Sequence, residues 1–332
     1  MATHRRIKLN NIDNSGFGPN SNVEGGRLTN KDGSTNLRKT GRPFWERISL
    51  YHTMLRMPRN KFWLFIILCY TVVNLFFATI YFLIGVDKLA GINPDTPLFE
   101  RFLNAFFFSS QTLTTVGYGH VAPNSITTSF VASIEAFVGI LAFAMVTGLL
   151  YGRFTRPRAY LLFSHNALVA PYKGGRALMF RMATFKNNHL TDAEAMVTAA
   201  VHVTENGKQL THFYPLGLEF SKVNSLALSW TVVHPLDEQS PLFGYSREDF
   251  LEARLELIVA VKAFDDHFSN TVQQRTSYHI SELVYGARFL PMFHRAEDGT
   301  HTVLELDKIN AHEPAKLAEP EISVADTTVA LG

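Results

Sequence analysis

Two long apolar stretches constrain this chain of 332 residues most strongly. The first, Trp63 to Ile84, has no charged residue, and the second, Ser125 to Tyr151, has Glu135 alone. A helix needs about 20 apolar residues to cross the hydrocarbon core of a bilayer. The sequence therefore predicts two transmembrane helices, over residues 60–84 and 125–152.

A shorter apolar and aromatic segment, 98–114, lies between these stretches and cannot span a bilayer. Pro97 precedes it, which suits the start of a helix. The run Thr115-Val-Gly-Tyr-Gly119 follows. Its glycines can adopt positive φ, so alternating backbone conformations could turn successive carbonyl oxygens toward one line. The alternative is an ordinary Gly-Tyr-Gly loop.

This run is identical to the TVGYG selectivity filter of potassium channels, and we identify it by that resemblance. The resemblance implies that four chains would build rings of carbonyl oxygens that replace the water around K⁺, the permeant ion. The filter would be Thr115, Val116, Gly117, Tyr118 and Gly119. Thr115 would add its hydroxyl as the innermost ligand.

Three polar residues are predicted to support the filter. Thr114 would end the pore helix, which is the segment 98–114. Gln111 would hydrogen-bond behind the filter, unless it is simply a buried polar group with a partner. Glu135 is ionisable at membrane depth, where such residues are functional by default. We expect it to hydrogen-bond behind the filter; a water-exposed position near the outer mouth is the alternative.

The second apolar stretch is expected to line the ion path. Phe143, Thr147 and Tyr151 lie four residues apart on one helical stripe and could form a gate that closes by excluding water. Contact with lipid or with another helix is the alternative. Gly139 and Gly148 could act as hinges or allow close packing.

Basic residues gather before the first span and after the second, which places both termini in the cytoplasm of a cell carrying the protein in its inner or plasma membrane. Attraction to anionic lipid is worth about 1 kcal/mol per basic residue near the surface. This predicts a site for anionic phospholipids or phosphoinositides, although the charges could be a topology signal alone. Its candidates are Arg56, Arg59, Lys61, Arg153, Arg156 and Arg158.

The N-terminal part divides into two segments. Residues 1–42 are rich in Asn, Gly and Ser and predict a flexible cytoplasmic tail, part of which could add an edge strand to the following domain. Residues 43–57 have an apolar stripe that predicts an interfacial slide helix. An ordinary surface helix on a soluble core is the alternative. Pro58 ends it.

From about residue 157 to 313 the periodicity changes to two, which predicts an antiparallel β-sandwich. Residues 314–332 are expected to be a loose C-terminal tail. Turn signals occur at 205–207 and 298–299. Strands are expected at Met196–Thr204, Ser225–His234, Arg254–Val261 and Val303–Leu306.

The sequence offers no catalytic motif. The 13 histidines are scattered, and the single cysteine, Cys69, excludes a disulfide within one subunit. We expect no enzyme, no cofactor, no metal site beyond the K⁺ carbonyl rings, and no nucleic-acid partner. Two other hypotheses remain: a non-conducting lipid or ligand sensor on the same scaffold, and a membrane-anchored enzyme.

Further motifs extend the resemblance. Arg153-Phe-Thr-Arg-Pro157, Ser229 to Asp237, and Gln274 to Tyr278 followed by Gly286 resemble the inward-rectifier potassium channels, most closely the prokaryotic KirBac-like branch. The resemblance covers about residues 33 to 310. It implies a homotetramer with an interfacial slide helix, a gate where the inner helices cross, and an immunoglobulin-like cytoplasmic domain. It also implies a cytoplasmic constriction at Ser269, Asn270, Thr271 and Val272.

The chain departs from the family pattern in three places. Phe143 replaces the acidic residue of strong rectifiers, so Mg²⁺ or polyamines should block only weakly, while Ba²⁺ remains a candidate blocker. Gln111 and Val121 replace a Glu–Arg pair around the filter. Ala159 replaces a base after Arg158, so the phosphoinositide site is partial and the sign of lipid regulation stays open.

Overall fold

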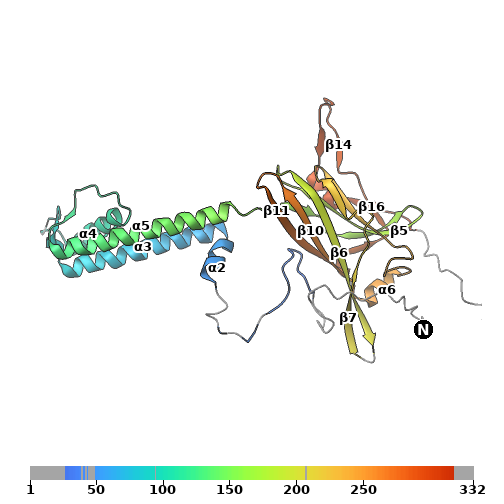
Figure 1. Ribbon diagram of the computed structural model, residues 1–332, viewed down its shortest axis with the longest axis horizontal. Helices are drawn as coiled ribbons and strands as arrows, with labels where there is room; N and C mark the ends of the chain where they lie inside the picture. The colour runs from blue at the N-terminus through green and yellow to red at the C-terminus, as the bar shows by residue number, and fades with distance from the viewer. Residues whose placement is uncertain are drawn as a thin grey trace, which may run out of the picture. The chain divides into compact units, whose positions relative to one another are not determined.

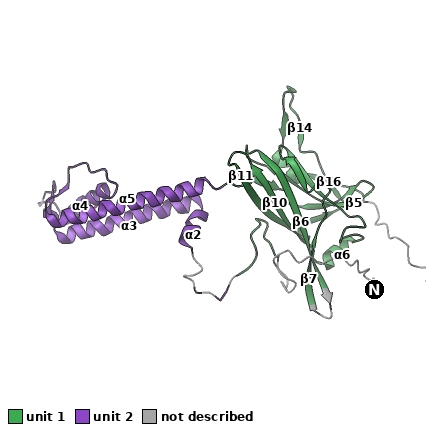
Figure 2. Ribbon diagram, viewed as in Figure 1, with its two compact units in different colours: residues 1–39, 157–332 green, residues 40–156 purple. Residues whose placement is uncertain are grey.

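The computed structural model describes residues 27–38, 40–41, 43, 49–93, 95–205 and 208–317. Residues 1–26 and 318–332 of the predicted tails and residues 44–48 of the predicted slide helix lie outside this description. The chain divides into two units, one of residues 40–156 and one of residues 1–39 with 157–332 (Figure 2).

The helical unit contains two helices long and apolar enough to cross a membrane, α3 and α5 (Figure 1). The short helix η1 and the paired strands β1 and β2 lie between α3 and α5 in sequence. The bounds are α2 Leu50–Arg56, α3 Arg59–Ile84, η1 Val86–Lys88, β1 Leu89–Ala90, α4 Leu98–Leu113, β2 Ala122–Pro123 and α5 Ile126–Phe154.

Local sequence explains where these helices begin. Pro58 and Pro97 stand at the N-caps of α3 and α4, where a missing N–H costs nothing. Ser125 caps α5, because its hydroxyl accepts the amide of Thr128 while the Thr128 hydroxyl accepts the amide of Ser125. Ser49 caps α2 by accepting the amide of His52.

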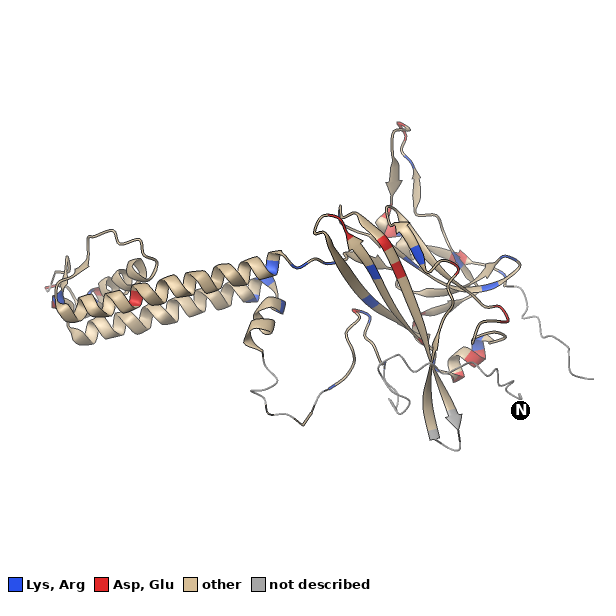
Figure 3. Ribbon diagram, viewed as in Figure 1, with Lys and Arg blue, Asp and Glu red and all other residues tan. Residues whose placement is uncertain are grey.

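A small apolar cluster joins the three longer helices. Phe77 and Tyr81 of α3 pack against Phe108 of α4, with the rings of Tyr81 and Phe108 edge to face at 5.0 Å between centroids. Most other large apolar side chains of α3 and α5 are exposed in the single chain. Charged residues are nearly confined to the ends of these helices (Figure 3). Such surfaces suit lipid and other copies of the chain rather than water.

The second unit consists mainly of two five-stranded sheets (Figure 1). One has the order β11-β10-β6-β7 with β8 beside β6, and the other β12-β4-β5-β3 with β9 beside β5. The first sheet comprises β6 Leu190–Glu205, β7 Lys208–Pro215, β8 Lys222–Ser225, β10 Glu256–Asp265 and β11 Asn270–His279. The second comprises β3 Leu161–Phe163, β4 Ala167–Tyr172, β5 Gly175–Thr184, β9 Ser229–Pro235 and β12 Leu283–Tyr285.

Shorter elements complete this unit. Strands β13 and β16 pair with each other, as do β14 and β15, whose connection contains Gly299 at φ 68°. Their bounds are α6 Arg247–Glu252, η2 Ile280–Glu282, β13 Ala287–Phe289, β14 Phe293–Arg295, β15 Thr302–Leu304, η3 Leu306–Asn310 and β16 His312–Pro314.

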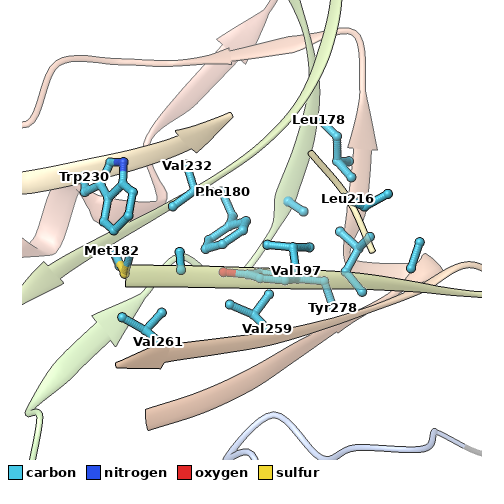
Figure 4. Packing of buried hydrophobic residues seen from close by; sticks show 14 of the residues in the cluster. Leu178, Phe180, Met182, Val197, Leu216, Trp230, Val232, Val259, Val261 and Tyr278 are labelled. Atoms are coloured by element: carbon cyan, nitrogen blue, oxygen red, sulfur yellow. The ribbon is translucent and has the colours of Figure 1, made fainter. Parts of the chain in front are cut away.

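One hydrophobic core lies between the two sheets (Figure 4). Phe180 of β5 and Val232 of β9 meet Val259 of β10 and Tyr278 of β11, whose ring lies 5.3 Å from that of Phe180. The alternating burial of β9 follows from the period of two in a strand. The predicted β-sandwich is confirmed.

Two details of the sandwich differ from the sequence prediction. The strand expected over Ser225–His234 is interrupted, because Leu226 turns into the core and its amide bonds the Leu190 carbonyl. The sandwich is not wholly antiparallel either, since β12 pairs with β4 in parallel. A 3₁₀ turn, η2, lets the chain re-enter beside β4, which periodicity alone could not reveal.

Part of the predicted flexible tail is ordered. Leu28 is 2% exposed and packs with Phe213, while the amides of Leu28 and Thr29 donate to the two carboxylate oxygens of Glu256, at 2.8 and 2.9 Å. Arg27 forms an ion pair of 2.7 Å with Glu282. Instead of adding a long edge strand, the segment makes a single bridge between Thr29 and Thr35. The tail prediction is therefore wrong for residues 27–36.

Candidate functional site

The segment that follows α4 has an alternating backbone. Thr115, Gly117 and Gly119 have φ of 60°, 54° and 79°, whereas Val116 and Tyr118 between them do not have positive φ. Glycine adopts this region readily, but a β-branched residue there is an outlier that costs about 1–3 kcal/mol. Strain of this kind persists only where surrounding contacts impose it. Thr115 and the residues after it must therefore be anchored by hydrogen bonds to neighbouring residues.

Those anchors are hydrogen bonds to the last turn of α4. The amide of Thr115 donates to the Thr112 carbonyl at 3.0 Å. The Gln111 carbonyl accepts the amides of Val116 and Gly117 at 3.0 and 3.2 Å, and the side-chain Oε1 of Gln111 accepts the amide of Tyr118 at 3.1 Å. One residue of α4 thus holds three successive amides of the segment.

Thr114 closes the helix itself. Its amide and its hydroxyl both donate to the Ser110 carbonyl, at 3.1 and 2.8 Å. This double contact ends α4 and fixes the direction in which the next residues leave.

The carbonyl oxygens of the segment remain available. Among the described residues, none of the carbonyls of Thr115 to Tyr118 accepts a hydrogen bond. Val116 is 54% and Tyr118 83% exposed in the single chain. Chemically, a row of unshared carbonyl oxygens can coordinate a dehydrated monovalent cation once several copies meet.

Glu135 of α5 is fully buried against α3 and α4. The hydroxyl of Tyr81 donates to its Oε2 at 2.7 Å, and the hydroxyl of Ser109 contacts its Oε1. Glu135 therefore contacts the pore-helix residue Ser109, and its burial removes the alternative of a water-exposed outer position. Among described residues, no group of three or more metal-ligating side chains occurs.

The three residues of α5 predicted to form the gate are exposed in the single chain. Phe143 is 76% and Tyr151 71% exposed, and Thr147 is exposed as well. Phe143 lines an open apolar pocket of about 560 Å³ together with Thr114 and Thr115. Phe143 thus shares a face of the unit with the start of the candidate filter.

The two glycines of α5 differ in their surroundings. A Cβ on Gly139 would lie 2.0 Å from the carbonyl oxygen of Leu113, so this glycine permits close contact between α5 and the end of α4. A Cβ on Gly148 would meet nothing within 4 Å. Helix α5 continues through both positions. Gly139 has a packing role, and a hinge at Gly148 stays a prediction.

The predicted lipid residues are not equivalent. Arg153 is half-buried, and its guanidinium donates to the carbonyls of Met54 and Met57, the latter at 2.7 Å, while lying over the Phe62 ring at 4.3 Å. Its charge therefore serves the end of α2. The others are exposed: Arg56, Arg59, Lys61 and Arg156 in the helical unit and Arg158 in the other.

The predicted cytoplasmic constriction falls at the turn between β10 and β11. Ser269 has φ of 46°, and Asn270 and Thr271 are exposed at the start of β11. Val272, by contrast, is 3% exposed and belongs to the sandwich core. Including Val272 in the constriction was therefore wrong, because its side chain faces inward.

Sequence reasoning missed several polar residues around the pore helix. Tyr70, Asn74 and Tyr81 of α3 and Ser109 of α4 all make hydrogen bonds to one another's helices or to Glu135. The available signal was their polarity within apolar segments. Only the packing of α3 on α4 shows which of them meet.

Comparison with known proteins identifies the family to which both parts of the chain are similar. The family model "Inward rectifier potassium channel C-terminal domain" matches residues 161–329, and "Ion channel" matches residues 65–156. The inward rectifier potassium channel Kirbac3.1 of Paramagnetospirillum magnetotacticum is 32% identical over 293 residues, covering 87% of this chain and 96% of its own length.

Animal relatives match less completely. Inward rectifier potassium channel 18 of Homo sapiens is 31% identical over 212 residues, 61% of this chain and 49% of its own length, so the chain spans about half of that relative. G protein-activated inward rectifier potassium channel 2 of Pongo abelii is 26% identical over 330 residues, covering 90% and 74%. Among solved structures, sporulation control protein Spo0M of Bacillus subtilis aligns with 39% of this chain and 50% of its own at 6% identity and a TM-score of 0.23, too low to bear on the fold.

Two membrane-length helices around a pore loop, followed by a β-sandwich, define a two-span membrane ion channel. The chain belongs to the inward rectifier potassium channel family. The predicted resemblance and fold class are confirmed. Membership makes it a membrane protein of a K⁺ channel family rather than of an enzyme class, and it implies a homotetramer.

Proposed function

We propose that four copies of the chain form a K⁺-selective pore in which the carbonyls of Thr115, Val116, Gly117 and Tyr118 form stacked rings that replace the hydration shell of the ion. Gly119 completes the turn out of the filter. No chemical step is needed, because conduction requires sites that bind K⁺ and pass it on. Closed symmetry about the pore follows from each chain supplying a quarter of every ring.

The three amide contacts of Gln111 carry this proposal. They turn the N–H groups of Val116, Gly117 and Tyr118 toward α4 and leave the carbonyls unshared on the described chain. When four copies bring such carbonyls together around one axis, their oxygens can replace the water that hydrates a K⁺ ion.

Two further parts of the proposal, the gate and the membrane orientation, are supported by exposed residues of α5 and by the distribution of basic residues. Phe143, Thr147 and Tyr151 would face the pore axis below the filter, and rings of Phe143 and Tyr151 would close the pore by excluding water.

The basic residues at the start of α3 and at the end of α5 favour cytoplasmic termini. Exposed Arg56, Arg59, Lys61, Arg156 and Arg158 would attract anionic phospholipids or phosphoinositides, and the exposed Ser269, Asn270 and Thr271 would narrow the cytoplasmic path. The apolar side chain of Phe143 predicts weak block by Mg²⁺ and polyamines.

Flux of ⁸⁶Rb⁺ into liposomes tests the proposal directly. Purified protein should give uptake that Ba²⁺ inhibits, and Gly117→Ala should abolish selective uptake while the tetramer still assembles, because alanine strains a φ of 54° although its Cβ has space. Retained selectivity in this variant would contradict the filter assignment.

The same assay separates a channel from a non-conducting lipid or ligand sensor. A sensor would assemble and bind anionic vesicles but give no Ba²⁺-sensitive flux in any lipid mixture. That outcome would leave the family assignment intact and overturn the proposed conduction.

A further inference from the structure

Among the completely buried polar side chains in the described part of the helical unit, four belong to one hydrogen-bonded network. Asn74 and Tyr81 of α3, Ser109 of α4 and Glu135 of α5 are each 0% exposed. Burying polar groups in an apolar, membrane-length helix pair costs several kcal/mol unless each finds a partner. Their contacts should therefore account for every donor and acceptor.

These contacts form one continuous chain. The Tyr81 hydroxyl donates to Oε2 of Glu135 at 2.7 Å. Oε1 of Glu135 lies within hydrogen-bonding distance of Ser109 Oγ, which in turn lies 3.2 Å from Oδ1 of Asn74. The amide Nδ2 of Asn74 donates to the Tyr70 carbonyl at 2.7 Å.

The number of available hydrogens bears on whether Glu135 in this network is protonated. Ser109 has one hydroxyl hydrogen and two oxygen neighbours, Glu135 Oε1 and Asn74 Oδ1. If Glu135 were ionised, one of the two Ser109 contacts would join two oxygens with no hydrogen between them. If Oε1 carries a proton, Glu135 donates to Ser109 and Ser109 donates to Asn74. Every contact then contains one hydrogen.

The electrostatics agree with this count. In the part of the chain that the structure describes, the polar contacts of Glu135 are hydroxyl groups, and no Lys or Arg pairs with it. A buried carboxylate without a cation is far more costly than a buried neutral acid with two hydrogen bonds.

We infer that Glu135 is a neutral carboxylic acid. The hydrogen-bonded network Tyr81–Glu135–Ser109–Asn74, here called the clamp, positions the pore helix α4. Ser109 is followed in α4 by Ser110, whose hydroxyl lies 2.5 Å from that of Tyr70, and by Gln111, which holds the filter amides. Three consecutive residues of α4 thus fix it to α3 and α5 on one side and to the filter on the other. The positioning effect rests on the proposed function.

A substitution by glutamine tests whether a neutral side chain at position 135 is sufficient to hold the pore helix. In Glu135→Gln, the amide oxygen can accept from Tyr81 and the amide N–H can donate to Ser109, which reproduces the neutral acid. If the network depended instead on the negative charge of an ionised Glu135, glutamine would remove that charge. We expect the ratio of K⁺ to Na⁺ permeability in Glu135→Gln to stay within about twofold of the parent, and to fall about tenfold in Glu135→Leu and Ser109→Ala, which lose hydrogen bonds.

Ser133→Ala is the matched control, because the Ser133 hydroxyl donates only within α5, to the Ser129 carbonyl at 2.9 Å. It should leave the permeability ratio unchanged. If the permeability ratio fell tenfold in Glu135→Gln, as much as in Glu135→Leu, the inference that a neutral acid at position 135 holds the pore helix would be overturned.

Infrared difference spectroscopy of the full chain tests the proton without requiring conduction. The parent minus Glu135→Gln spectrum should contain the C=O band of a protonated carboxylic acid at neutral pH. A carboxylate band in its place would overturn the inference. Failure of flux in the parent protein would instead count against the proposed function, so the two failures are distinguishable.

Discussion

Gly139 of α5 lies against the carbonyl oxygen of Leu113, so closely that an added Cβ would stand 2.0 Å from it. Leu113 is the last residue of α4, two positions before the candidate filter begins. Helix α5 and the C-terminal end of α4 are therefore in direct backbone contact, at a position where no side chain larger than hydrogen fits.

Gly139→Ala should separate α5 from the end of α4. We expect a destabilisation of about 1–3 kcal/mol or more, as for other overpacked sites. Thermal unfolding and tetramer yield in detergent measure it. Gly148→Ala is the control, because its Cβ meets nothing within 4 Å; equal losses in both variants would point to helix flexibility rather than to this contact.

The side chain of Gln111 predicts a split between two substitutions. Gln111→Met removes the acceptor for the Tyr118 amide, whereas Gln111→Glu retains an acceptor oxygen. Leaving that amide unpaired costs about 1–3 kcal/mol, so K⁺ selectivity should fall in the first variant more than in the second. Reversal potentials in mixed K⁺ and Na⁺ solutions test this, and identical selectivity in both variants would rule out the anchor.

Arg153 should behave differently from its exposed neighbour Arg156. Arg153→Met removes the donors to the carbonyls of Met54 and Met57 and should lower stability by about 1–3 kcal/mol with or without anionic lipid. Arg156→Met should change binding to anionic vesicles and leave stability nearly unchanged. A loss in Arg153→Met that appears only with anionic lipid would show that its main partner is a headgroup.

The docking of the N-terminal segment depends on one carboxylate. Glu256→Leu removes the acceptor of the Leu28 and Thr29 amides, so hydrogen exchange at these two amides should accelerate at least about tenfold. Glu252→Leu, at an exposed position of α6, should leave their exchange unchanged. Unaltered protection in Glu256→Leu would mean that Arg27 and Leu28 suffice for docking.

The sandwich should lose stability in mild acid through His234. Burial lowers the pKa of His234 from its usual 6.5, although the Gly217 carbonyl and Asp237 act in the opposite direction. As the pH falls below 6.5, the unfolded chain takes up the proton first, so the free energy of unfolding decreases down to the lower folded pKa.

Thermal unfolding of the full chain from about pH 7 to pH 5 measures this slope, which should be shallower in His234→Gln. Burial also lowers the pKa of His202, so His202→Gln should remove a further part of the slope. A slope that neither substitution changes would assign the acid sensitivity to other groups.

The sequence by itself determined the class of this protein. Two apolar runs of membrane-crossing length, the segment Thr115 to Gly119 and a later period of two are local patterns. Each follows from rules of burial and backbone geometry that act along the chain. Polar residues such as Glu135 and Gln111 could be named as candidates for the same reason. Their partners could not.

Only the tertiary structure decided which residues meet. Ser109 and Glu135 are 26 positions apart, and Thr29 and Glu256 are 227 apart, so neither contact has a local signature. In the structure, the side chain of Val272 lies in the core, Arg153 donates to carbonyls at the end of α2, and residues 27–36 dock on the sandwich. In each case the decision came from packing between elements, which sets the burial and hydrogen-bond partners that a one-dimensional pattern leaves open.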